Sequence, residues 1–138
     1  MRRTETFRQQ HTTILDVVTA FRGLLDPEKV VDNIPDIMGV MIGFSGKLKA
    51  HLAKEDNELY PDLLALGDPK LSELATAFQA EMGGLSTAFD NYMETWRSIE
   101  AIEDNPDGFV RASEEILDAL SDRINRENRE LYALADRL

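Results

Sequence analysis

Two histidines and two glutamates are the residues of this chain whose types and spacing suit metal binding. His11 and His51 are the only histidines in the sequence. Glu55 follows His51 by four residues, so an imidazole and a carboxylate would share one face of a helix. Such nitrogen and oxygen donors suit iron, manganese or zinc, and Glu127 offers a further carboxylate. A lone buried histidine is usually a hydrogen-bonded structural residue. Here both histidines fall on apolar stripes, and this favours descent from a metal site.

The apolar pattern predicts four helices that would position these residues. Hydrophobic residues recur at three- and four-residue steps, and prolines beside turn-forming residues separate the segments. Asp68-Pro69 and Asn105-Pro106 each pair an N-cap residue with proline at the first helical position, and Thr4 is the expected cap of the first helix. The expected helices cover residues 4–25, 33–61, 69–99 and 106–134, approximately. We expect an all-α fold, an up-down-up-down antiparallel four-helix bundle, as one domain over residues 1–138.

The second half of the chain repeats the first. Residues 51–60 (HLAKEDNELY) align with residues 123–132 (RINRENRELY), and residues 7–18 align with residues 78–89. The bundle is therefore expected to be a duplicated helical hairpin. The alignment pairs equivalent inward positions: His11 with Met82, His51 with Arg123, and Glu55 with Glu127. We expect these six residues to converge in one layer at the middle of the bundle interior.

These motifs resemble those of the hemerythrin-like (HHE) family over nearly the whole chain. Residues 7–11 (FRQQH) resemble the family's opening motif, and residues 51–61 (HLAKEDNELYP) closely resemble its HxxxE signature. Glu81-Met82 stands where the family has Glu-His, and Arg123 stands at the histidine of the second HxxxE. The resemblance implies a bundle with a non-haem di-iron centre bridged by two glutamates. It also implies a protein that handles oxygen, nitric oxide or peroxide, or that stores or senses iron.

Replacement of two family histidines changes the expected site. Arg123 stays protonated and has no lone pair for a metal, and the Met82 thioether is a poor ligand for iron. The candidate ligands that remain are His11, His51, Glu55 and Glu127. An intact di-iron centre is therefore not expected. The site is expected to hold either no metal or a single iron or related divalent ion.

Two functions follow from these two states of the site. Without metal, the buried carboxylates need a partner, so Arg123 is expected to pair with Glu55 and Glu127 while Met82 fills volume. We favour this state, in which the protein is a non-enzymatic regulatory module that binds a protein partner or forms a homodimer. The alternative is a sensor or handler of O2, NO or peroxide that uses one metal ion. A third hypothesis, storage of cations on the acidic surface, has no specific feature in its favour.

Composition excludes several other classes. The formal net charge of −11 disfavours binding to nucleic acid and to anionic lipid. No apolar run is long enough for a secretion signal or a membrane span, and with no cysteine we expect a cytoplasmic protein. The Glu-x-x-His, HExxH and GxSxG motifs and glycine-rich phosphate loops are all missing, so ferritin-like, zinc-protease, hydrolase and nucleotide-binding functions are not expected.

Two further features of the sequence carry weaker expectations. Tyr60 and Tyr132 occupy equivalent repeat positions and are expected to cap the end of the bundle. Gly83-Gly84 follow Met82 inside a predicted helix, where glycine costs up to about 1 kcal/mol each relative to alanine. Close approach of a neighbouring helix is the ordinary explanation for these glycines. The functional one is room for a small ligand or a channel beside the site.

Overall fold

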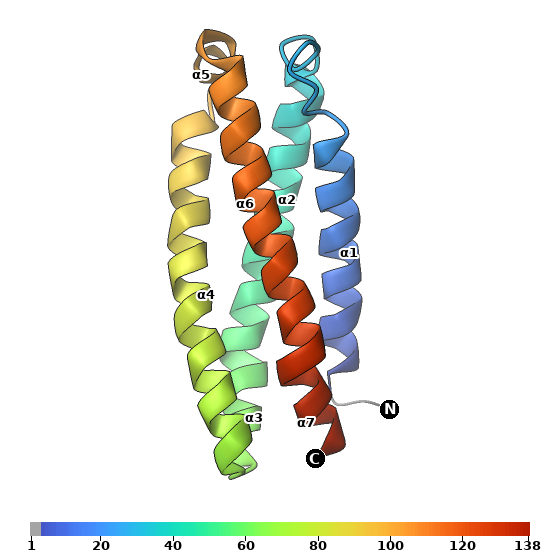
Figure 1. Cartoon of the computed structure of the whole chain (residues 1–138), viewed down its shortest axis with the longest axis vertical. Helices are drawn as coiled ribbons and strands as arrows, with labels where there is room; N and C mark the ends of the chain where they lie inside the picture. Colours follow the sequence, from blue (N-terminus) through green and yellow to red (C-terminus); the bar gives the residue numbers. More distant parts are fainter. Residues whose placement is uncertain (1–3) are drawn as a thin grey trace.

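The computed structural model describes residues 4–138, and every regular element within that range is helical. The elements in chain order are α1 (Glu5–Arg22), α2 (Ile34–Lys54), η1 (Glu55–Leu59), α3 (Tyr60–Ala65), α4 (Pro69–Trp96), α5 (Ile99–Asp104), α6 (Pro106–Arg126), η2 (Glu127–Tyr132) and α7 (Ala133–Arg137). The helices α2, η1 and α3 follow one another without a break, as do α6, η2 and α7. The described chain therefore forms four long rods (Figure 1).

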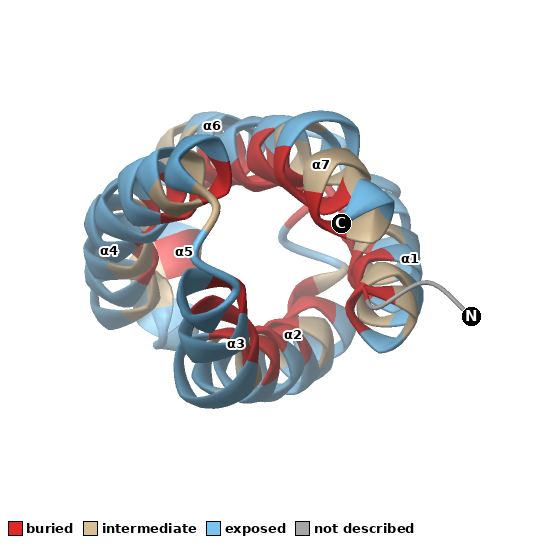
Figure 2. Ribbon diagram, turned by 90° about the horizontal axis from the view of Figure 1, so that it is seen from below, coloured by how far each residue is buried: buried red, intermediate tan, exposed pale blue. Residues whose placement is uncertain are grey.

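The four rods form the expected antiparallel bundle. Successive rods run in opposite directions, and α5 lies in the connection at the end of the bundle opposite the termini (Figure 1). Contacts join α1 to α2, α3 to α4, α4 to α6, and α6 back to α1. Seen along the bundle, the buried side of each rod faces a shared interior (Figure 2). The prediction of an all-α up-down-up-down bundle is confirmed.

All three predicted N-cap residues directly precede a helix, and two of them cap it with a side-chain hydrogen bond. The side chain of Asp68 accepts a hydrogen bond from the Leu71 N–H at 2.9 Å, and Asn105 does the same for the Gly108 N–H at 3.1 Å. Thr4 directly precedes α1, as predicted, but its side chain makes no cap hydrogen bond. The Thr4 hydroxyl instead contacts the Asp136 carboxylate at 2.8 and 2.9 Å, which ties the first helix to the last.

The third helix is shorter than its apolar stripe suggested. It ends at Trp96, and Ser98 caps a separate short helix by accepting a hydrogen bond from the Ala101 N–H at 3.2 Å. Ile99 therefore starts α5 and is 48% exposed, so the expectation that the third helix extends to residue 99 was wrong. The second rod continues past Pro61 to Ala65, and Gly67 then reverses the chain with a φ of +72°.

A polar layer divides the core into two apolar clusters. The larger cluster fills the bundle toward the α5 end, and the smaller one, which includes Phe7, Leu63 and Phe78, lies toward the termini. The buried polar side chains between them include His11, His51, Glu55, Arg123 and Glu127. The layer is therefore displaced from the middle of the bundle, where it was expected, toward the end that carries the termini.

Two π-helical turns, η1 and η2, interrupt the second and fourth rods at equivalent repeat positions. In η1 the Tyr60 N–H bonds to the Glu55 carbonyl, five residues back. This wider turn brings Glu55 and Tyr60 to the same side of the rod, and Glu127 and Tyr132 are buried in the same way. No proline occurs in or directly after η2, so Pro61 is not what makes these turns.

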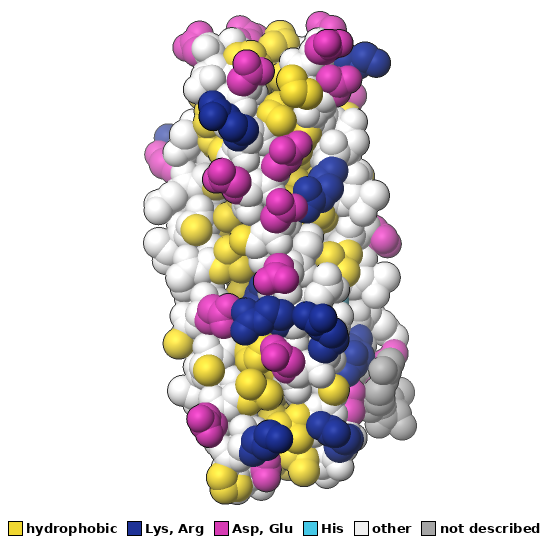
Figure 3. All heavy atoms as spheres, viewed as in Figure 1, with side chains coloured by type: hydrophobic (Ala, Val, Ile, Leu, Met, Phe, Trp, Pro, Cys, Tyr) yellow, Lys and Arg dark blue, Asp and Glu magenta, His cyan; other side chains and the backbone are white. Residues whose placement is uncertain are grey.

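On the face shown in Figure 3, acidic and basic side chains are interspersed over the surface. None of the helices between residues 4 and 138 combines the length and the apolar character needed to cross a membrane.

Candidate metal centre

Three of the four predicted ligands meet in the polar layer. His11 lies on α1, His51 on α2, and Glu55 at the first position of η1, and all three are at most 4% exposed. One donor atom from each lies within 4.8 Å of the others. Among residues 4–138 this is the one group of at least three histidine or acidic side chains close enough to share a metal ion. No comparable group is found on the acidic surface of the described chain, so surface storage of cations gains no support.

Hydrogen bonds orient both imidazole rings. His11 Nδ1 lies 2.9 Å from Asn128 Oδ1, and His51 Nδ1 lies 2.6 Å from Gln10 Oε1. Because these amide oxygens can only accept, each Nδ1 carries the proton and each Nε2 keeps its lone pair. Metal-binding histidines are held in this way by partners on the nitrogen that does not face the ion.

Several buried side-chain atoms of the layer have no hydrogen-bond partner. His51 Nε2 lies 2.6 Å from Glu55 Oε1, yet neither atom makes a hydrogen bond, and Glu127 Oε2 also has none. Two acceptor atoms this close repel each other unless a proton or a cation lies between or beside them. A cation held by these nitrogen and oxygen donors would satisfy them, so the residues present fit a metal ion.

Glu127 stands beside this group and is shared with Arg123. Glu127 Oε2 lies 4.0 Å from His11 Nε2, while its Oε1 accepts a hydrogen bond from Arg123 Nε at 3.3 Å. One oxygen of Glu127 is thus left for the ion. The fourth predicted ligand is therefore buried in the same layer but is not part of the three-residue group.

Burial sets the protonation of the layer. It lowers the pKa of His11 and of His51 to about 4, so both rings are neutral at pH 7, the form that binds metal. Burial also raises the pKa of Glu55, and burial together with the neighbouring Glu55 carboxylate raises the pKa of Glu127 to about 8. Without a cation, the two carboxylates therefore share a proton at neutral pH.

Arg123 contributes the one fixed positive charge of the layer. The guanidinium group is 3% exposed and lies 4.3 Å from the centre of the Phe78 ring. Besides Glu127, it contacts Glu81 at 3.1 Å and donates a hydrogen bond to the Phe78 carbonyl oxygen. The expected pairing with Glu127 is present. No ion pair links Arg123 to Glu55 in the described chain; its second carboxylate partner is Glu81, which is exposed and also binds Arg126 at 2.5 Å.

The two tyrosines were misplaced by the sequence analysis. Tyr60 and Tyr132 are at most 2% exposed and lie beside the carboxylates rather than at the end of the bundle. Tyr132 donates a hydrogen bond to Glu55 Oε2 at 3.2 Å and lies 3.3 Å from His11 Nε2. The spacing of five residues between each glutamate and its tyrosine, present in both halves, was the available signal. In a regular α-helix, residues five apart lie on different faces, so this spacing alone does not predict that both side chains face the interior.

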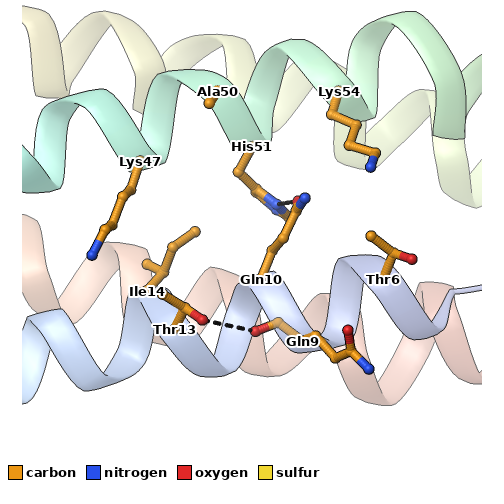
Figure 4. Close-up of a pocket in the computed structure, with 9 residues that line it drawn as sticks. All are labelled: Thr6, Gln9, Gln10, Thr13, Ile14, Lys47, Ala50, His51 and Lys54. Atoms are coloured by element: carbon orange, nitrogen blue, oxygen red, sulfur yellow. Dashed lines mark hydrogen bonds between the residues drawn. The ribbon is translucent and has the colours of Figure 1, made fainter.

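The amides that orient the histidines were also missed. Gln10 precedes His11 in the chain but forms its hydrogen bond with His51 on the neighbouring rod. Asn128 follows Glu127 and forms its hydrogen bond with His11. Figure 4 shows the Gln10 and His51 side chains meeting in a groove of about 530 Å³ between α1 and α2, with Lys47 and Lys54 on its wall. The groove brings solvent close to His51 but not to Glu55.

Met82 is buried, whereas the two glycines that follow it are exposed to solvent. Met82 is buried against the layer, as expected for a side chain that fills volume. Gly83 and Gly84 are exposed, and a Cβ atom added to either would meet nothing within 4 Å. Close helix approach is therefore not the reason for these glycines.

Comparison with protein families matches residues 2–135 to the hemerythrin HHE cation binding domain. Comparisons with curated proteins and with solved structures gave no match. The matched range contains every residue of the polar layer.

Proposed function

This chain belongs to the hemerythrin HHE cation-binding family, and from that premise we propose that it binds one divalent transition-metal ion through His11, His51 and Glu55. The observation that carries the proposal is the convergence of three buried side chains with one donor atom of each within 4.8 Å of the others, while His51 Nε2 and Glu55 Oε1 have no hydrogen-bond partner. Imidazole and carboxylate donors favour iron, manganese or zinc over calcium or magnesium.

Arg123 limits the site to one ion. Its charge already neutralises one of the two buried carboxylates, and a second divalent ion would place three cationic groups around two carboxylates. Met82, at the position equivalent to His11, offers no ligand that suits iron. The layer therefore supports the single-ion alternative better than the metal-free state that the sequence favoured.

With iron bound, the ion would supply a site for a small oxidant such as O2, NO or peroxide. The residues of the chain would hold and shield that site. Gln10 and Asn128 orient the imidazoles, Tyr132 holds Glu55 through its hydrogen bond, and the two apolar clusters exclude bulk water. This arrangement suits a sensor or handler of small oxidants.

Metal analysis tests the proposal directly. Protein purified with iron, manganese or zinc supplied should retain close to one ion per chain, and His51→Ala should retain none. Lys54→Ala, one turn away on the same rod, should bind like the wild type because Lys54 offers no ligand to the layer. Retention of nearly two ions, or of none, would overturn the single-ion site.

The contacts of Arg123 favour a second candidate function. A buried ion pair with Glu127 that continues to the exposed Glu81 links the layer to the surface of α4 and α6. On this basis the metal-free protein would act as a regulatory module for a protein partner or a second copy of the chain. Molar mass in solution, measured with and without metal, tests it: a mass that is monomeric and equal in both states, with no partner retained, would count against this role.

A further inference from the structure

A cleft of about 270 Å³ between η1 and α4 reaches Glu55 of the candidate metal centre, and it lies between the second and third rods, whereas the other groove lies between α1 and α2. We call it the η1/α4 cleft. Its wall consists of Leu52, Glu55, Asp56, Tyr60, Gln79, Met82, Gly83 and Ser86. The volume lies just below the range of pockets that hold cofactors and drug-sized ligands, so the cleft suits a molecule of only a few atoms.

Two buried side chains present unsatisfied polar atoms on this wall. Tyr60 is 2% exposed and its hydroxyl makes no hydrogen bond, although Glu55 and Arg123 lie near enough to affect its pKa. Glu55 belongs to the metal group, and its Oε1 also makes no hydrogen bond. A buried hydroxyl without a partner is uncommon in proteins and marks a place where a bound molecule or water completes the hydrogen bonding.

The charge of the cleft disfavours anions. Its ionisable wall residues, Glu55 and Asp56, are acidic apart from the Tyr60 phenol, so anions are repelled. Gly83 is an exposed position on the cleft wall, and a Cβ added there would meet nothing within 4 Å, so a larger side chain can be introduced without a clash at its Cβ. The Met82 thioether lines the same cleft.

We propose that the η1/α4 cleft is the route by which a small uncharged molecule reaches the metal centre, and that Tyr60 donates a hydrogen bond to that molecule. The hydrogen-bonding role rests on the proposed metal site, whereas the route does not. The two parts therefore have separate tests. A negative result for the route can be distinguished from absence of the metal site, because the route is tested in metal-free protein.

Met82 reports on the route without any metal. In chelated protein, hydrogen peroxide transfers one oxygen atom to the thioether sulfur and leaves as water. Peptide mass spectrometry should show Met82 oxidised several-fold faster than Met41, which is 1% exposed and does not line the cleft. Gly83→Leu should slow Met82 oxidation several-fold by covering the cleft.

Gly84→Leu is the matched control for this test. Gly84 has the same exposure and open surroundings but does not line the cleft, so its leucine variant should oxidise at the wild-type rate. Equal thermal melting of the two variants would show that both fold. If Gly83→Leu leaves the Met82 rate unchanged, or if Met82 reacts no faster than Met41, the cleft is not the route.

Nitric oxide titrated onto iron-loaded protein tests the role of Tyr60. Tyr60→Phe should weaken nitric oxide binding several-fold while retaining the same iron content. Tyr92→Phe is the control, since the Tyr92 hydroxyl bonds to Ser113 away from the polar layer. Unchanged affinity in Tyr60→Phe would remove Tyr60 from the proposal, and loss of iron in the wild type would instead refute the metal site.

Discussion

At the scale of single residues, the chemistry of this protein depends on where the positive charge of the polar layer comes from. Two carboxylates and two neutral imidazoles face one another, and His51 Nε2 and Glu55 Oε1 approach to 2.6 Å without a hydrogen bond. Arg123 compensates Glu127 on one side of the layer. The histidine side of the layer is left for a proton or a metal ion.

Restoring the two missing histidines should create a second metal site. Met82 and Arg123 occupy the positions equivalent to His11 and His51, and both are buried in or against the layer. The double variant Met82→His, Arg123→His adds two imidazoles and removes the competing charge. We expect metal analysis to rise from one ion per chain to two. Arg126→His, at a partly exposed position on the same helix, is the control and should leave the content at one.

The raised pKa of Glu127 predicts a stability that depends on pH in chelated protein. The pKa of about 8 in the fold exceeds the ordinary value of 4.5, so the folded state keeps a proton that the unfolded state loses. The histidines, whose folded pKa values of about 4 lie below the ordinary 6.5, destabilise the fold increasingly as the pH falls toward and below 6.5, and this offsets part of the Glu127 effect. Between pH 6.5 and 8 the Glu127 effect is the larger of the two, and the free energy of unfolding should fall by about 1 kcal/mol.

Denaturant unfolding at the two pH values measures this fall. Glu127→Gln carries no titrating group and should lose this fall, whereas Glu130→Gln, an exposed position in the same turn, should keep it. A wild-type protein equally stable at both pH values would show that Glu127 does not hold a proton in the metal-free fold.

At the scale of elements, the two π-helical turns determine which side chains reach the polar layer. Each turn begins at a glutamate of the layer and carries the tyrosine five residues later to the same side. A regular α-helix would direct one of the two away from the interior. The repeat of this feature in both halves fits the duplicated hairpin inferred from the sequence.

Glycines on the helices give a prediction about element stability. Gly43 is an exposed residue inside α2, and a Cβ added to it would meet nothing within 4 Å, so Gly43→Ala should raise the free energy of unfolding by about 0.5–1 kcal/mol.

Gly108 differs from Gly43, because a Cβ there would collide with the Asn105 side chain that caps α6. Gly108→Ala should lower the free energy by about 1 kcal/mol through loss of that cap. Denaturant unfolding measures both, and a gain in both variants would contradict the assigned role of Asn105.

At the scale of the whole molecule, the polar layer joins segments that are distant in the sequence. Its side chains come from α1, α2, η1, α6 and η2. In addition, Thr4 and Arg8 bind Asp136, and these contacts join the start of the first rod to the end of the last. A metal ion held by His11, His51 and Glu55 would cross-link the first two rods. Metal binding should therefore be linked to global folding.

This linkage can be measured by thermal or denaturant unfolding with and without a chelator. At a free metal concentration of 100 times Kd, the wild type should gain about 2.7 kcal/mol of unfolding free energy over the chelated protein. His51→Ala should show no gain, since it lacks a ligand that the ion needs. Equal stabilisation of the wild type and His51→Ala would place the ion elsewhere on the acidic surface.

The fold and most candidate residues could be predicted from the sequence because they depend on local signals. Periodic apolar residues predicted the four rods, and Asp68-Pro69 and Asn105-Pro106 marked two of their starts correctly. The internal repeat predicted that His11, His51, Glu55 and Glu127 would all face the interior, and all four are buried. Helix periodicity alone determines such orientations, so no knowledge of the partner helices was needed.

The pairing of these side chains was decided only in the tertiary structure. Arg123 forms ion pairs with Glu81 and Glu127 rather than with Glu55. Gln10 forms a hydrogen bond with His51 on another helix rather than with its sequence neighbour His11. Such choices depend on how far a flexible side chain reaches between packed rods and on the local widening of the helix at η1 and η2. Neither quantity follows from residue spacing, because spacing specifies the face of a helix and not the neighbour that the face meets.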